Sequence, residues 1–85
     1  MAKASQVERQ ARAVCAELAR VTGARPMRWA TVDSIMAAAG VADAAADDAI
    51  AFAAGQDWLL TEGQPPHSIC LTESGRVMAA KMKPR

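Results

Sequence analysis

The fold of this 85-residue chain is decided by residues 57–76, which read DWLLTEGQPPHSICLTESGR. Two short runs of β-favouring residues, 57–61 and 68–72, lie on either side of a polar stretch that contains glycine and two prolines. Apolar runs of this length around a cluster of turn formers are typical of a β-hairpin. The stretch therefore predicts a hairpin with a loop over 62–67.

A final helix is predicted directly after the hairpin, over about 73–82. Thr72 can accept a hydrogen bond from a free amide of the first turn, and Glu73 complements the positive end of the helix dipole. Gly75 has no Cβ, so the helix can approach another backbone closely at this point. Its inward side is expected to include Val77, Met78 and Met82.

Two short helices joined by a tight turn are predicted before the hairpin. The first covers 32–39, with Thr31 as its N-cap and Gly40 as a left-handed stop. The second covers 44–55 and is expected to be capped by Asp43. Its buried side is expected to include Ala46, Ile50 and Ala53. Such a pair is a helix-turn-helix arrangement.

The amino-terminal helix is predicted over about 5–21. Apolar residues recur there every three or four positions, which makes one face of an α-helix. These residues are Val7, Ala11, Val14, Leu18 and Val21. A positive stripe on the opposite face is expected from Arg9, Arg12 and Arg20. The helix closes at 22–23, residues 25–26 prevent its continuation, and a loop or short extended stretch over 27–30 follows.

The predicted order is helix, short strand, helix, helix, strand, loop, strand, helix, which is a mainly α fold with a small β-hairpin, of the α+β class. Trp58-Leu59-Leu60, then a polar loop, then Leu71-Thr72-Glu73-Ser74-Gly75-Arg76, resembles the second half of bacterial winged-helix regulators of the MarR and related types. The resemblance covers about 31–80 and implies a winged helix-turn-helix domain that binds DNA in transcription regulation. It also implies that the 44–55 helix enters the major groove and that the hairpin loop, the wing, follows the sugar-phosphate edge.

Length and composition are consistent with one domain over 1–85 and a modest core, because much of the 52% hydrophobic content is alanine. A plain helix bundle is the alternative fold, and Pro65-Pro66 between β-favouring runs argues against it.

Cys15 and Cys70 lie in apolar contexts without a disulfide pattern, which favours reduced thiols. Without a signal-like start or a membrane-length apolar run, we expect a cytoplasmic protein with no membrane contact.

Charge changes sign twice along the chain, although the net charge is only +1. Residues 1–28 carry six basic and two acidic side chains, and residues 64–85 carry four basic and one acidic. Residues 29–63 carry six acidic side chains and no basic one. The segment that the resemblance assigns to the major groove is therefore the acidic one, which disfavours binding to a polyanion.

Two functions remain open at this point. The outward positions of the 44–55 helix offer no donor to guanine or adenine, and Asp47 and Asp48 would face the phosphates. A DNA contact would fall to Arg25, Arg28, Thr31, Ser34, His67 and Arg76. Alternatively, a winged helix can serve as a protein-interaction or dimerisation domain. That contact would use Arg9, Arg12, Arg20, Asp47, Asp48 and Trp58, and could join the basic and acidic regions of two copies.

An enzyme is not expected. The chain has one histidine, no glycine-rich phosphate loop and no nucleophile beside a base. Cys15, Cys70 and His67 lack the close spacing of a zinc site. We therefore expect no catalytic residue, no metal and no cofactor.

Overall fold

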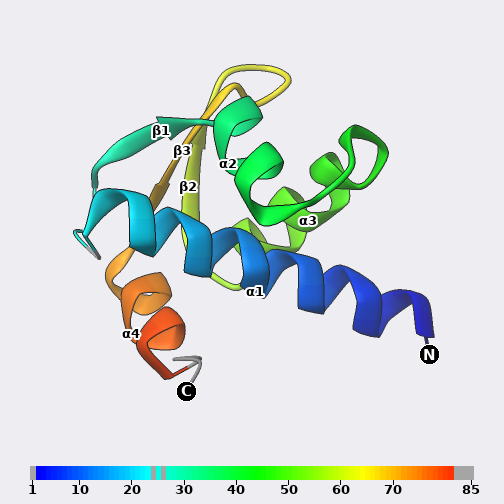
Figure 1. Ribbon diagram of the computed structural model, residues 1–85, viewed down its shortest axis with the longest axis horizontal. Helices are drawn as coiled ribbons and strands as arrows, with labels where there is room; N and C mark the ends of the chain where they lie inside the picture. The colour runs from blue at the N-terminus through cyan, green and yellow to red at the C-terminus, as the bar shows by residue number, and fades with distance from the viewer. Residues whose placement is uncertain (1, 24, 26, 82–85) are drawn as a thin grey trace.

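The computed structural model describes residues 2–23, 25 and 27–81 and shows an α+β fold (Figure 1). Within these residues, four helices accompany a small antiparallel sheet of three strands. In chain order, the elements are α1 (Ala2–Thr22), β1 (Trp29–Thr31), α2 (Val32–Ala39), α3 (Asp43–Gly55), β2 (Leu59–Glu62), β3 (Ser68–Leu71) and α4 (Glu73–Lys81). The mainly helical composition with a small hairpin is confirmed.

The sheet has the strand order β1-β3-β2, so the short strand before α2 pairs with the second strand of the hairpin. Ser68 lies opposite both Thr31 and Glu62 at the end nearest the hairpin loop, and Leu71 lies opposite Leu59 at the other end. The loop lies at the top of Figure 1, and α4 lies beyond the opposite end of the strands. The sheet therefore has a loop end and an α4 end.

The hairpin is slightly shorter than predicted. Its strands cover 59–62 and 68–71 instead of 57–61 and 68–72, and its loop covers Gly63–His67. Asp57 has a φ of 66°, a left-handed conformation that turns the chain out of α3. The strand cannot include this residue, which is why it begins later.

The helix ends follow local capping chemistry with one exception. Thr31 accepts a hydrogen bond from the Ser34 amide at 3.4 Å, and Gly40 ends α2 at a φ of 73°. The prediction that Asp43 caps α3 is wrong, because Ala42 takes the extended N-cap conformation and Asp43 is already helical. The Asp43 carboxylate instead lies in the first turn, where it complements the helix dipole.

The core lies between the helices and the inner face of the sheet. Its largest fully buried side chains include Leu18, Ile35, Leu59, Ile69 and Leu71. Ala46, Ile50 and Ala53 of α3 are buried as predicted.

Two residues predicted to face inward do not. Val21 is 52% exposed, because it lies roughly 70° from the centre of the buried face of α1 at 100° per residue. Val77 is also exposed, while its neighbour Met78 takes the buried position on α4. The third inward residue predicted for this helix, Met82, lies outside the described residues.

The close approach predicted at Gly75 is confirmed. A Cβ at this position would lie 2.1 Å from the Trp58 carbonyl oxygen. The same carbonyl accepts a hydrogen bond from the Thr72 amide at 3.0 Å, and the Thr72 hydroxyl donates to the Asp57 carbonyl. The Gly75 amide donates to the Thr72 hydroxyl oxygen at 3.0 Å, so Thr72 also caps α4. These contacts hold the start of α4 against the turn that follows α3.

Candidate interaction surfaces

The outer face of the sheet presents an apolar row that crosses all three strands. Directly opposed residues of an antiparallel pair point to the same face, and Leu60 and Trp29 both lie opposite Cys70. Leu71, Leu59 and Ile69 point to the core, so this row faces outward. Leu60 is 40% exposed and Trp29 is 45% exposed. We call Trp29, Cys70 and Leu60 the outer row.

Cys70 is the covered centre of the outer row. Its side chain is buried, yet it does not belong to the core cluster that the other buried apolar residues form. It lies in register between two larger side chains, Trp29 and Leu60. Burial raises the pKa of the Cys70 thiol, and a hydrogen bond from the Leu60 backbone opposes this shift. The thiol is therefore a packing group rather than a reactive one.

A charged residue lies near each end of the outer row, but only Glu62 shares its face, because Arg28 is adjacent to Trp29 and successive residues of an extended chain point to opposite faces. Glu62 lies opposite Ser68 at the loop end and is exposed. Arg28, also exposed, directly precedes Trp29 on the α4 side of the row. The neighbouring Met27 amide donates to the Leu71 carbonyl at 3.0 Å, which places this segment at the α4 end.

Three of the residues predicted to contact DNA lie together at the loop end of the sheet. Thr31 and Ser34 share the capping hydrogen bond of α2. The Val32 amide donates to the His67 carbonyl at 2.9 Å, which joins the start of α2 to the hairpin loop. His67 Nδ1 lies 3.2 Å from the Ser68 hydroxyl oxygen. Thr31, Ser34 and His67 are exposed, but this group contains no lysine or arginine.

The three arginines predicted to contact DNA lie elsewhere. Arg25 and Arg28 precede β1, and the length of β1 separates Arg28 from the start of α2 by about 10–13 Å at ~3.3 Å per residue. Arg76 is on α4, where its guanidinium pairs with the Glu73 carboxylate. Hydrogen bonding to Arg76 lowers the pKa of Glu73. The structure therefore does not bring the predicted cations and the start of α2 onto one surface.

The surface formed by α2, α3 and the hairpin loop is acidic. Asp43, Asp47 and Asp48 are exposed on α3, and the ion pairs of the described residues do not include them. No lysine or arginine occurs in the sequence between Arg28 and Arg76. The negative charge of this surface is therefore not compensated from within the same segment.

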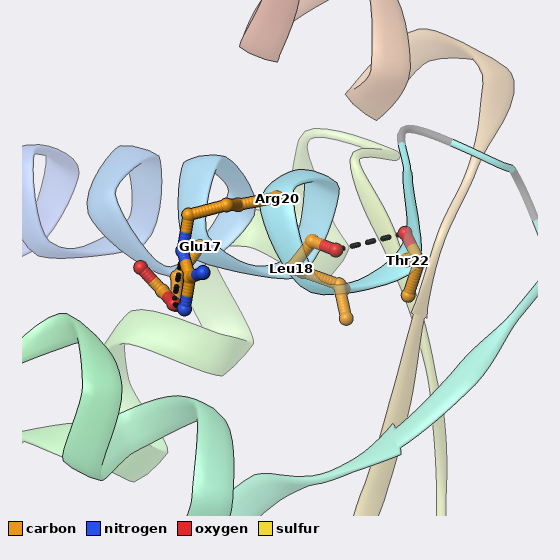
Figure 2. Close-up of polar contacts among 4 residues, drawn as sticks. All are labelled: Glu17, Leu18, Arg20 and Thr22. Atoms are coloured by element: carbon orange, nitrogen blue, oxygen red, sulfur yellow. Dashed lines mark hydrogen bonds and ion pairs between the residues drawn. The ribbon is translucent and has the colours of Figure 1, made fainter.

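Ion pairs compensate the charge of two of the three arginines in the predicted positive stripe on α1. Arg12 pairs with Glu8 one turn earlier, at 2.8 Å, and Arg20 pairs with Glu17 (Figure 2). The hydrogen bond from Arg20 to Glu17 is the main reason for the raised pKa of that arginine. Arg9 is exposed and has no ion pair among those of the described residues. The predicted stripe therefore carries much less free positive charge than its arginine count suggests.

Trp58, predicted to contact a partner, mainly packs against its own chain. Its ring lies 5.9 Å from the Phe52 ring, and the Arg12 guanidinium carbon lies 5.1 Å from the Trp58 ring centre. Arg12 and Trp58 border an open groove of about 510 Å³ whose lining also includes Met78 and Lys81. Trp58 is half-buried, so much of its side chain is covered by its own chain and cannot contact a partner.

Arg12→Ala should lower the free energy of unfolding by about 1 kcal/mol, because Arg12 has both an ion pair and a contact with the Trp58 ring. Arg20→Ala is the matched control, because Arg20 has only an exposed ion pair within α1. This variant should lower the free energy of unfolding by less than about 0.5 kcal/mol. Urea unfolding followed by circular dichroism measures both. Equal costs for the two variants would show that the contact with Trp58 adds nothing.

The described residues contain no group of three His, Cys, Asp or Glu side chains that could hold a metal ion. Both cysteines are free, and burial raises the pKa of Cys15 to about 12. None of the described helices is long and apolar enough to cross a membrane.

No protein-family model, curated protein or solved structure matches the chain. The resemblance to winged-helix regulators therefore stays a prediction. Function has to be inferred from the chain's own surfaces. The sequence alone did not predict the outer row, because its three residues can be recognised as neighbours only when the strand register is known.

Proposed function

We propose that the chain is a winged helix that binds another protein through the outer face of its sheet. The element order α1-β1-α2-α3-β2-β3-α4 supports the winged-helix assignment, as does the pairing of β1 with the second hairpin strand. In this assignment, α2 and α3 form the helix-turn-helix and Gly63–His67 form the wing.

The observation that carries the proposal is the exposure of Trp29 and Leu60 on one row of the sheet. Exposed apolar side chains are common singly, and larger exposed apolar patches mark contact surfaces. Trp29 and Leu60 lie on one face on either side of Cys70. Tryptophan is also enriched among the residues that dominate binding energy at protein interfaces. This face is on the sheet, away from the acidic α3.

The negative charge of the surface formed by α2, α3 and the hairpin loop also favours a protein ligand over DNA. A winged helix that reads DNA places its recognition helix in the major groove, so Asp47 and Asp48 would approach the phosphates. Non-specific affinity for DNA comes almost entirely from lysine and arginine at phosphates. The segment 29–75, which holds the helix-turn-helix and the hairpin, contains neither. The proposed function is therefore protein binding, with DNA binding as the competing hypothesis.

A titration of a fluorescently labelled random duplex with the whole chain tests the proposal against DNA binding. At about 50 mM salt, where non-specific binding is strong, we expect no change in anisotropy up to about 100 μM protein. Binding that weakens steeply as salt is raised would contradict the proposal.

A further inference from the structure

We infer that α4 is a contact surface between two copies of this chain, which pair through antiparallel α4 helices about a two-fold axis at Val77. The inference goes beyond the proposed function, because it uses a surface separate from the outer row. A two-fold axis places each surface against an identical one, so the surface must complement itself in both polarity and charge.

One side of α4 is not covered by its own chain. The helix packs mainly against α1 and β3, and Figure 1 shows it at the edge of the molecule, across α1 from α2. Glu73, Val77 and Lys81 are exposed and recur every four residues, so they follow one another along one face of the helix. All three also line the open groove beside Trp58. We call Glu73, Val77 and Lys81 the α4 row.

The α4 row meets the first condition, polarity. Its central residue, Val77, is apolar and 42% exposed. On the two-fold axis, this side chain packs against Val77 of the partner, which removes apolar surface of both copies from water. Trp58 and Met78 line the same groove, so the apolar surface continues beside Val77.

Charge meets the second condition. Glu73 and Lys81 each lie about 6 Å from Val77 along the helix axis, in opposite directions, at 1.5 Å per residue. In an antiparallel pair, Glu73 of one protomer is therefore level with Lys81 of its partner, and the axis makes this contact twice. A parallel pair would place like charges together at both positions. The charges thus select the antiparallel arrangement.

Both charged groups of the α4 row can take a further partner. Arg76 donates to Glu73 only through Oε2, so Oε1 accepts no side-chain hydrogen bond within the part of the chain that the structure describes. The ion pairs of the described residues do not include Lys81. Each contact between the copies would be exposed, so it contributes little by itself and weakens with salt.

The α4 row also fixes how the two helices cross. Residues spaced by four form a ridge that is inclined to the helix axis, and two such ridges lie parallel when the axes cross at about −50°. A two-fold axis perpendicular to the ridge at Val77 makes the two rows run along each other in opposite directions. The apolar contact and both charged contacts are therefore made in the same arrangement.

The short contact makes the dimer weak. The α4 row spans about 12 Å along the helix, at 1.5 Å per residue. Two helices that meet over this length bury less than the ~800 Å² per copy of a standard interface. We therefore expect a reversible dimer with a dissociation constant between about 50 μM and 1 mM.

Sedimentation equilibrium of the whole chain over about 10 μM to 1 mM tests the inference. Val77→Glu should weaken the dimer at least tenfold, because it brings two carboxylates together on the axis. Val21→Glu is the matched control: Val21 is also an exposed helical valine, but it lies on α1 and does not line the groove, so the dimer should be unchanged. Circular dichroism checks that each variant is folded.

A charge exchange tests the orientation of the two copies. Glu73→Lys and Lys81→Glu should each weaken the dimer several-fold, because each places like charges together at both contacts. The double variant should recover most of the wild-type affinity, because it restores opposite charges. A fold defect would not be repaired in this way, so recovery reports on the contact itself.

A chain that remains monomeric at about 1 mM overturns the homodimer, as does a Val77→Glu variant that dimerises like the wild type. If the double charge exchange dimerises no better than the single ones, the antiparallel arrangement is wrong. Neither result bears on the outer face of the sheet. Salt-dependent DNA binding would overturn the proposed function, and the duplex titration detects it separately from the oligomeric state.

Discussion

Gly75→Ala is expected to destabilise the fold by about 2–4 kcal/mol, although alanine is the better helix former by about 1 kcal/mol. The new Cβ would lie 2.1 Å from the Trp58 carbonyl oxygen and 3.0 Å from a methyl carbon of Leu71. The first contact is with backbone and cannot be relieved by a rotamer change. To remove it, α4 must move away from the turn, which weakens the hydrogen bond from the Thr72 amide to the same carbonyl.

Thermal unfolding followed by circular dichroism measures this effect, and the melting temperature should fall by about 8–32 °C at 4–8 °C per kcal/mol. Gly55→Ala is the matched control. Gly55 is the last residue of α3, and nothing lies within 4 Å of its Cβ position. That variant should melt at or slightly above the wild-type temperature. If Gly75→Ala and Gly55→Ala have the same melting temperature, α4 does not approach the Trp58 backbone as closely as the structure shows.

The double variant Asp47→Lys/Asp48→Lys is expected to gain at least tenfold in affinity for random duplex DNA at low salt. If α3 is the recognition helix of a winged helix, the change replaces two negative charges by two positive ones where the groove would lie. Both residues are exposed, so the fold should tolerate the change.

The control for this variant is Glu8→Lys/Glu17→Lys, which changes the net charge equally but acts on α1. If charge alone decides affinity, both double variants will bind DNA to the same extent. If the α3 surface is the one that the fold would present to DNA, the α3 variant will bind more tightly. Equal binding would contradict the winged-helix orientation assigned to α3.

Much of the fold could be predicted because it depends on local chemistry. Thr31 and Thr72 cap the helices that follow them, and the left-handed Gly40 ends α2. The role of Gly75 also followed from its missing Cβ. Each of these features depends on residues within a few positions of one another, or on a side chain that is absent.

The candidate surfaces were predicted less well, because they depend on register and on partners across the fold. A shift of one residue in β3 would turn Cys70 inward and remove the outer row, and the sequence does not state the register. The pairs Glu8–Arg12 and Glu17–Arg20 were missed for a different reason. Their spacing of four and three residues was visible in the sequence and predicts contact on a helix.

The claim that this chain binds protein and not DNA is tested most directly by amide chemical shifts of the whole chain. Random duplex DNA is added at about 50 mM salt, where non-specific binding is strong. We predict that DNA shifts no amide of the described helices and strands. DNA-dependent shifts in Val32–Ala39, Asp43–Gly55 and the hairpin loop that disappear as salt is raised would contradict the claim.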